Sequence, residues 1–312
     1  MSQYVFGVDI GGTTVKLGYF DAEGNVLDKW EIPTRKEDNG SNILPDIAAS
    51  IEKKIRDAGI DRKDVAGVGV GAPGPVDGKG IIHKAANLGW GVFSIKETLE
   101  NILKLPVMAG NDANVAALGE MWKGGGQGYK DLVVVTLGTG VGGGIIVNGK
   151  ILTGANGAGG EIGHIHVEDA EQETCGCGNR GCLEQYSSAT GITRLAKRKL
   201  EKTTQDSILR TKTLSAKSVF DAVKAKDPVA MEVAEQFGKY LGEGLAAIAC
   251  VTNPEAFVIG GGVSKAGPVL IDYIRPYYQR VVFHASRDAK FELATLGNDA
   301  GIFGAAKLVL DR

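Results

Sequence analysis

The residues best suited to chemistry in this sequence are cysteines and histidines that lie close together in the chain. The stretch 161–184 reads EIGHIHVEDAEQETCGCGNRGCLE, and its cysteines are Cys175, Cys177 and Cys182. Zinc prefers four thiolate or imidazole ligands in a tetrahedron, and three thiolates with one imidazole form a common structural set. The glycines between the cysteines allow a tight loop in which the sulfur atoms converge. We therefore predict a zinc site with His164 as the fourth ligand and His166 as the alternative.

The same cysteines could instead form a disulfide beside a free thiol, or be inert core residues. We expect no secretory segment at the start of the chain, and cytosolic thiols stay reduced, which favours the metal. Two carboxylates bracket the stretch, because Glu161 lies three residues before His164 and Glu184 two residues after Cys182. A rigid metal loop would hold these carboxylates at its edge, where they could accept hydrogen bonds from the hydroxyls of a sugar.

Asp112 is the candidate for a catalytic base. It lies in the segment GNDAN, after a short strand predicted over 105–109 and before a helix predicted over 115–122. The positive end of the helix dipole favours an ionised carboxylate, which is the form that a base requires. An aspartate at this position could equally cap the helix. The local sequence does not separate the two roles.

The first of two glycine-rich turns is Gly11-Gly12-Thr13-Thr14, between strands predicted over 4–10 and 14–20. Its backbone N–H groups and threonine hydroxyls could bind phosphate oxygens. Asp9, at the end of the first strand, would face those phosphates and could hold magnesium through water. This is not a Walker loop, because GxxxxGK[ST] is missing and no helix follows. A plain hairpin with an incidental aspartate is the alternative.

The second turn, LGTGVGGG, follows a strongly apolar strand predicted over 131–137. Gly138, Gly140 and Gly143 match the GxGxxG pattern of dinucleotide-binding folds. However, residues 144–152 predict a strand, an Asn-Gly turn and another strand instead of the helix that such a fold needs. A second glycine hairpin is the better interpretation. Two such hairpins, one in each half of the chain, predict two related domains that face each other across a nucleotide.

The other segments predict the elements that position these residues. Helices are predicted over 42–58, 185–201, 215–224, 228–251 and 300–310, and further strands over 25–32, 65–71, 256–259 and 290–296. The turn Gly260–Ser264 separates a strand from a helix that begins near Pro268, and it leaves room for a flat ring at Gly261 and Gly262. It is the candidate adenosine site. Asn87 lies in a polar and aromatic loop that suits a sugar, although a surface turn explains it nearly as well.

Composition limits the classes of function. A chain of 312 residues is long enough for two domains with a ligand cleft between them. The net charge of -2 gives no electrostatic footprint for nucleic acid or a membrane surface, and no apolar run is long enough to span a bilayer. The 46 glycines are about twice the usual share, and their clusters predict backbone loops close to ligands. Cys250, in an apolar helical segment, is predicted to be a core residue.

The motifs DIGGTTVK, GNDAN, LGTGVGGG, EIGH and CGCGNRGCLE occur in this order over nearly the whole length. In these motifs the chain resembles the sugar kinases of the ROK family (repressor, open reading frame, kinase), most closely its bacterial ATP-dependent glucokinases. The resemblance implies an α/β fold in which two actin-like (ribonuclease H-like) ATPase domains flank a central cleft. The smaller domain would span 1–114 and the larger, with the zinc-binding loop, 115–299. The last helix, within 300–312, would pack back on the first domain.

The resemblance also implies roles for individual residues. The reaction would be ATP-dependent phosphorylation of the 6-hydroxyl of glucose, with magnesium on the ATP and Asp112 as the general base. The implied sugar ligands are Asn87, Asn111, Asp112, Glu161, His164 and Glu184. The implied nucleotide contacts are Asp9, Gly11, Gly12, Thr13, Thr14, Lys16, Gly138, Thr139, Gly140, Gly261 and Gly262. The implied ligands of a structural zinc are His164, Cys175, Cys177 and Cys182.

Several alternatives stay open within the family. The substrate could be fructose, mannose or an N-acetylhexosamine, the donor could be polyphosphate, and a sugar sensor without catalysis is the less favoured reading. The family's repressors carry a helix-turn-helix domain before the first glycine hairpin, and a strand that begins by Tyr4 leaves no room for one. We expect a cytoplasmic homodimer or homotetramer with small-molecule substrates and neither nucleic-acid nor membrane partners.

Overall fold

Two five-stranded sheets form the framework of the protein, for which the computed structural model describes residues 4–312. The strand order is β3-β2-β1-β4-β7 in the first sheet and β10-β9-β8-β11-β12 in the second. In both sheets three antiparallel strands are extended by two parallel ones. The two halves of the chain therefore repeat one topology, which is the mixed α/β architecture predicted from the paired glycine hairpins.

The first lobe consists of the first sheet, two helices packed on it and one short helical turn. Its strands are β1 (Tyr4–Ile10), β2 (Thr14–Asp21), β3 (Val26–Pro33), β4 (Val65–Ala72) and β7 (Val107–Asn111). Its helices are α1 (Glu37–Gly40), α2 (Ile43–Asp57) and α3 (Ile95–Leu103), and a small hairpin pairs β5 (Ile81–Ile82) with β6 (Phe93–Ser94). The isoleucines of α2 that recur every four residues are all buried against the sheet, as their spacing predicts: Ile43, Ile47, Ile51 and Ile55.

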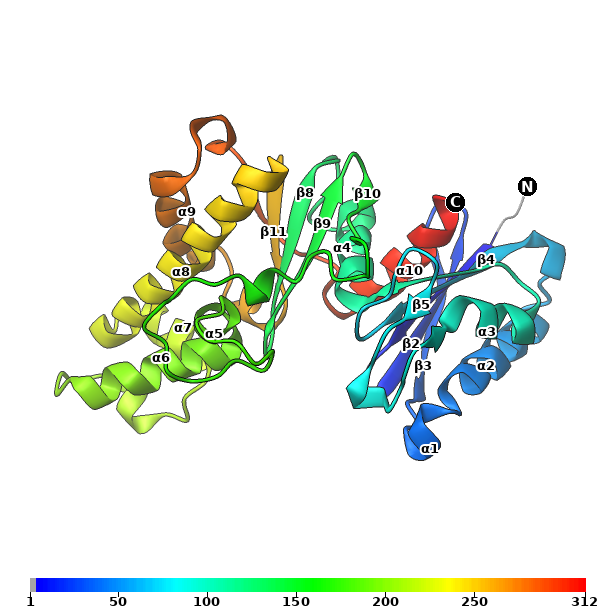
Figure 1. Ribbon diagram of the computed structural model, residues 1–312, viewed down its shortest axis with the longest axis horizontal. Coiled ribbons are helices and arrows are strands. Elements are labelled where there is room, and N and C mark those ends of the chain that lie inside the picture. Colours follow the sequence, from blue (N-terminus) through cyan, green and yellow to red (C-terminus); the bar gives the residue numbers. More distant parts are fainter. Residues whose placement is uncertain (1–3) are drawn as a thin grey trace.

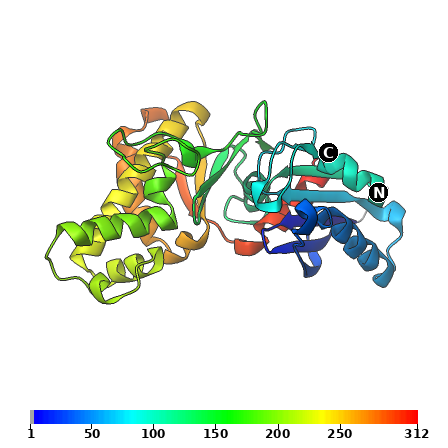
Figure 2. The same ribbon diagram turned by 60° about the horizontal axis from the view of Figure 1, so that its bottom comes forward.

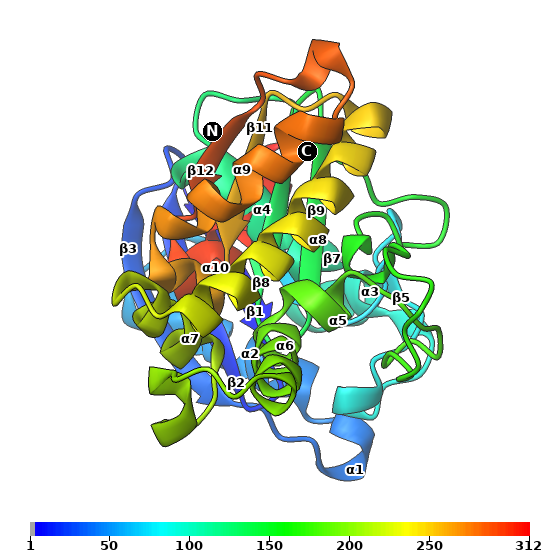
Figure 3. The same ribbon diagram turned by 90° about the vertical axis from the view of Figure 1, so that its left-hand side faces the viewer.

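The second lobe consists of the second sheet and a layer of helices on its outer face (Figure 3). Its strands are β8 (Leu132–Leu137), β9 (Val141–Val147), β10 (Lys150–Ile151), β11 (Ala256–Gly260) and β12 (Lys290–Leu293). Its helices are α5 (Glu184–Ser187), α6 (Ala189–Lys202), α7 (Ala216–Lys224), α8 (Pro228–Thr252) and α9 (Val269–Val281). Asp227 caps α8 and Pro228 is its first residue, as the sequence predicts.

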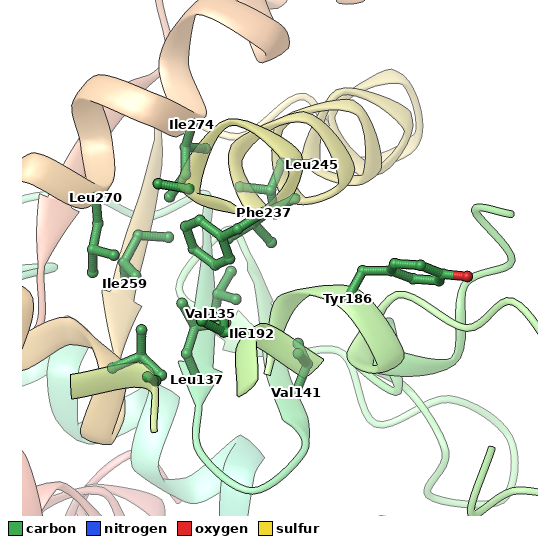
Figure 4. Close-up of a cluster of buried hydrophobic side chains, with 14 of the residues drawn as sticks. Val135, Leu137, Val141, Tyr186, Ile192, Phe237, Leu245, Ile259, Leu270 and Ile274 are labelled. Carbon is green, nitrogen blue, oxygen red and sulfur yellow. The ribbon is translucent and has the colours of Figure 1, made fainter. Parts of the chain in front are cut away.

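The core of the second lobe lies between the sheet and these helices (Figure 4). Figure 4 shows Val135, Leu137 and Ile259 of the strands facing Phe237 of α8 and Ile274 of α9. All five side chains are completely buried. Burial of an aliphatic or aromatic side chain of this size contributes about 1.5–3 kcal/mol, so this layer gives the sheet a stable support for the residues at the end of β8.

Two helices lie between the sheets, α4 (Asp112–Lys123) and α10 (Ala300–Leu310) (Figures 1 and 2). Helix α10 packs on β1 and β4 of the first lobe and on α4, whereas α4 also packs on β9 of the second lobe. The contact is so close that only glycine fits at several positions. A Cβ on Gly304 would lie 1.6 Å from the carbonyl oxygen of Val115, and one on Gly69 would lie 1.7 Å from that of Ala305.

Two predictions about single residues or elements differ from the structure, and one helix was missed. The helix predicted over 185–201 is broken at Ser188, whose extended backbone ends α5 and whose hydroxyl caps α6. Helix α3 was not predicted, although Ser94 caps it by accepting from the N–H of Glu97. Cys250 was wrongly predicted as a core residue, because it lies on the exposed side of α8. Within residues 4–312, no helix combines the length and the apolar composition needed to cross a membrane.

Candidate active site

A cleft of about 510 Å³ opens beside the N-terminal end of α4 and is lined by residues of both lobes. Eight of the residues singled out in the sequence line it together: Asp9, Lys16, Asp112, Gly138, Gly140, Glu161, His164 and Glu184. They come from the first glycine hairpin, the start of α4, the second glycine hairpin and the loop that carries the cysteines. Segments far apart in the sequence thus converge on one cavity.

Asp112 is the first residue of α4, and its carboxylate faces this cleft. The cap of the helix is the preceding residue, Asn111, whose side-chain oxygen accepts from the N–H of Asn114 at 3.1 Å. Capping therefore does not account for Asp112. Its Oδ1 accepts from the N–H of Ala113 at 2.8 Å and from Nδ2 of Asn111 at 3.0 Å. Burial raises the pKa of Asp112, and the negative charge of Glu161 adds to the rise.

A second carboxylate, that of Asp9, lines the same cleft from the end of β1. Burial raises its pKa to about 6, the charge of Asp112 adds to this rise and the ammonium group of Lys16 opposes it. Lys16 lies opposite Asp9 in the β1–β2 pair, and its Nζ donates to the backbone oxygen of Asn298 at 3.1 Å. A Cβ on Gly301 would lie 2.5 Å from Cγ of Asp9, so the first turn of α10 lies directly against this carboxylate.

The predicted zinc ligands come together in the loop before α5. One ligand atom from each of His164, Cys175, Cys177 and Cys182 lies within 4.8 Å of all the others. The Sγ atoms of Cys177 and Cys182 are 3.6 Å apart, close to the roughly 3.8 Å expected for two thiolates on one tetrahedral zinc. The donor set and its spacing therefore fit a zinc ion.

The alternative fourth ligand, His166, is turned away from this cluster. Its Nδ1 lies 3.0 Å from the backbone oxygen of Arg180 and its Nε2 lies 2.8 Å from Oδ1 of Asp169.

Burial raises the pKa of the Cys175 thiol. Zinc binds the thiolate form, so metal binding at this cluster would release protons.

His164 and Glu184 connect the cysteine cluster to the cleft. Nδ1 of His164 lies 3.8 Å from Sγ of Cys175, whereas Nε2 points to Oε2 of Glu161 at 4.0 Å. Oε1 of Glu184 accepts from the Cys175 thiol at 3.0 Å, and its Oε2 lies 3.4 Å from the N–H of Val141. A Cβ on Gly140 would lie 2.5 Å from that same Oε2. The cysteine loop and the second glycine hairpin are therefore held together through Glu184.

The remaining nucleotide candidates surround the two hairpins without lining the cleft. Gly11 donates its N–H to the carbonyl oxygen of Thr14 at 3.0 Å, and Gly12 and Thr13 lie at the partly to fully exposed tip of this turn. Thr139 is exposed at the tip of the second hairpin. Gly261 has a φ of +81°, and its Cα lies against the backbone of Leu137 at the base of that hairpin. Gly262 is exposed next to it.

Two of the implied sugar ligands do not line the cleft. Asn87 is exposed in a short turn of the first lobe. Nδ2 of Asn111 donates to the backbone oxygen of Gly74 at 3.1 Å, and the residue lines a neighbouring cavity behind α4. Conversely, no pattern in the sequence pointed to Asn298 and Gly301, which line the cleft. Only the packing of α10 on β1 brings them there.

The sequence model of the ROK family matches residues 5–312. A glucokinase of Halalkalibacterium halodurans is 45% identical over 98% of this chain and 95% of its own. A ROK family glucokinase of Streptomyces griseus, solved in complex with glucose and AMPPNP, superposes with a TM-score of 0.75 at 36% identity, covering 98% of both chains. A putative xylose repressor of Caldicellulosiruptor is 29% identical and is covered over 78% of its length. These full-length matches confirm the predicted two-lobed fold.

Proposed function

The chain belongs to the ROK family, and from this premise we propose that it is a glucokinase, which transfers the γ-phosphoryl group of ATP to the 6-hydroxyl of glucose. Similarity over nearly the full length to curated glucokinases supports this activity. The observation that carries the mechanism is the shared cleft, in which the carboxylates of Asp112 and Asp9 face the edge of the cysteine loop.

Asp112 is the proposed general base. Phosphoryl transfer passes through a loose transition state, so the protein contributes mainly alignment, charge stabilisation and a proton acceptor. The Asp112 carboxylate would accept the proton of the sugar hydroxyl as that hydroxyl attacks the phosphorus atom. Burial raises the pKa of Asp112, and a carboxylate with a higher pKa is a stronger base.

Glu161, His164 and Glu184 are the proposed sugar ligands, with Asn87 and Asn111 joining them if the lobes close. A structural zinc on His164 and the three cysteines would supply rigidity to this loop. Nδ1 of His164 is the nitrogen that faces the cysteines and Nε2 the one that faces the cleft. With Nδ1 acting as the ligand, Nε2 carries the proton and can donate to a sugar oxygen. Glu161 and Glu184 would accept from sugar hydroxyls.

The nucleotide would bind along the two glycine hairpins. Backbone N–H groups of residues 11–14 and 138–140 are suited to phosphate oxygens, and Lys16 would add a positive charge. Asp9 would hold the magnesium ion of the ATP through water, and this ion would supply positive charge to offset that of the phosphates. Gly261 and Gly262 would lie under the adenosine.

We further propose that the lobes, 1–114 and 115–299 with the last helix packed on the first, close when sugar binds. The cleft is open to water, and water held beside the γ-phosphate would be phosphorylated in place of the sugar. Closure on the sugar would exclude this water.

We expect the protein to form a homodimer or homotetramer in solution, and sedimentation analysis would measure which.

A panel of sugars and donors tests the proposed function. Glucose with ATP and magnesium should give the highest kcat/KM, because the full-length relatives of highest identity given above are glucokinases. Fructose, mannose, N-acetylhexosamines and polyphosphate complete the panel. A higher kcat/KM for another hexose would move the assignment to that sugar. Glucose binding without phosphoryl transfer from any donor would identify a sugar sensor instead.

The raised carboxyl pKa values predict a pH dependence of catalysis. Burial raises the pKa of Asp9 to about 6, and it also raises the pKa of Asp112 in the same cleft. Protonation of Asp112 removes the base, and protonation of Asp9 removes the negative charge that would hold magnesium, so kcat/KM should fall as the pH drops below about 6. The charges of Asp9 and Asp112 interact, so the acid limb of the profile reports both carboxylates together. A pH profile measured from 4.5 to 8 checks this, and Asp9→Asn should move the acid limb to lower pH. A limb centred near 4 would contradict the assignment.

A further inference from the structure

The chain passes between the lobes twice, and one buried carboxylate holds both passages. The first passage connects β7 of the first sheet to β8 of the second by way of α4 and residues 124–131, and the second runs from the end of β12 to α10, over 294–299. Glu120 lies one turn before the end of α4 and is only 2% exposed. A buried carboxylate needs several hydrogen-bond donors to offset the loss of its hydration.

All three donors to the Glu120 carboxylate are backbone N–H groups of these passages. Oε2 accepts from Gly125 at 2.9 Å and from Thr295 at 3.1 Å, and Oε1 accepts from Leu296 at 3.0 Å. Within residues 4–312, no lysine, arginine or histidine forms an ion pair with it. A Cβ on Gly124 would lie 1.9 Å from Oε2. The backbone is therefore shaped around this carboxylate.

The second passage continues directly into the wall of the cleft. Leu296, held by Glu120, precedes Gly297 and Asn298, both of which line the cleft. The backbone oxygen of Asn298 accepts from Lys16 Nζ. Helix α4 carries Glu120 near its C-terminal end and Asp112 at its N-terminal end. A single rigid helix thus connects the proposed base to both connections between the lobes.

We propose that Glu120 is a positioning residue that ties the two passages together and thereby holds the nucleotide side of the cleft in register with Asp112 during closure. The role of Glu120 in catalysis rests on the proposed glucokinase function. The connection between the two passages is independent of that function, because it consists of three hydrogen bonds. Gly7, Gly69, Gly119 and Gly304 let the helices and the first sheet approach closely, so a shift of residues 295–298 would be transmitted to α10 and β1.

The test compares Glu120→Gln with Asp227→Asn. Asp227 is a matched control, because it is a buried carboxylate that accepts from two backbone N–H groups and a hydroxyl, all within the second lobe. Glutamine keeps the size of Glu120 but turns an NH₂ group towards backbone donors. Both variants should lower the melting temperature. Only Glu120→Gln should weaken AMPPNP binding, measured calorimetrically with magnesium, by at least tenfold, and reduce the compaction on adding glucose and AMPPNP, measured by X-ray scattering.

Equal losses of melting temperature with AMPPNP affinity and compaction within twofold of wild type in both variants would overturn the proposal. Nucleotide affinity and compaction are measured without turnover, so they separate this proposal from the glucokinase assignment, which the panel of sugars and donors tests on the wild type. Should Glu120→Gln not fold, hydrogen exchange of the wild type decides. We expect protection like that of the core of α4 at the backbone amides of Gly125, Thr295 and Leu296. Exchange of these amides at the rate of exposed loops would refute the proposed role of Glu120.

Discussion

Asp112→Asn should lower kcat for glucose phosphorylation by at least about a hundredfold while the fold and glucose binding persist. A positioned general base contributes about 10²–10⁴ in rate, and asparagine cannot accept the proton. The substitution keeps the size of the side chain and its hydrogen bonds from Ala113 and Asn111. Helix α4 keeps its cap, because the cap is Asn111. The measurement is steady-state kcat together with the Kd of glucose from calorimetry.

The matched control is Asp61→Asn, which makes the same change at an exposed cap of the first lobe, outside the cleft. It should leave kcat within about twofold of wild type, since surface substitutions of this kind rarely affect function or stability. A kcat for Asp112→Asn within tenfold of wild type would remove Asp112 from the role of base. Loss of glucose binding in the same variant would instead assign it to substrate binding.

Local sequence patterns were sufficient for the elements that carry their own signals. The glycine turn after β8, the Asn-Gly turn between β9 and β10, and the Asp227-Pro228 start of α8 all follow from residue types at fixed positions. Helix α3 also carried such a signal, because Ser94 precedes Glu97 by three residues in the pattern of a capping box.

Contacts between distant segments could not be predicted in this way. The proximity of Asn298 to Lys16 depends on how α10 packs across β1 and β4. No periodicity in either segment encodes that contact. The sequence did single out candidates for reactive residues, because aspartate after a strand and cysteines in a glycine loop are unusual locally. The residue patterns alone did not indicate which of these candidates would share one cavity, which only the resemblance to the family implied.

The glycines also fall into two groups, those whose role follows from local sequence and those whose role depends on contacts between distant segments. Their clusters were interpreted as loops close to ligands, and Gly138 and Gly140 do line the cleft. Isolated glycines such as Gly69 and Gly304 have a different role, since each removes a side chain where a helix touches a strand or another helix. Overpacking of a tight contact costs about 1–3 kcal/mol or more. Glycine at these positions therefore reflects the packing of the two central helices, which a count of glycines does not reveal.

The second large effect concerns the metal. Cys177→Ser should lower bound zinc from about one equivalent to under a tenth and reduce kcat/KM for glucose by about ten- to a hundredfold, the range seen when the support of a ligand is lost. Cys177 is the ligand to test, because Cys175 also contacts Glu184 directly, so its substitution would mix two effects. Loss of the ion frees His164 and the loop that positions Glu161. Metal analysis of purified protein and steady-state kinetics provide the two measurements.

Cys250→Ser is the control, because Cys250 is exposed on α8 and outside the cluster. It should keep both zinc and activity, which separates loss of a ligand from loss of any thiol. Wild-type protein with less than a tenth of an equivalent of zinc would count decisively against the metal. If Cys177→Ser lost zinc but kept kcat/KM for glucose, the cluster would be a stabilising element only. His164 and Glu184 would then be held without the ion, by their contacts with Glu161, Val141 and Cys175.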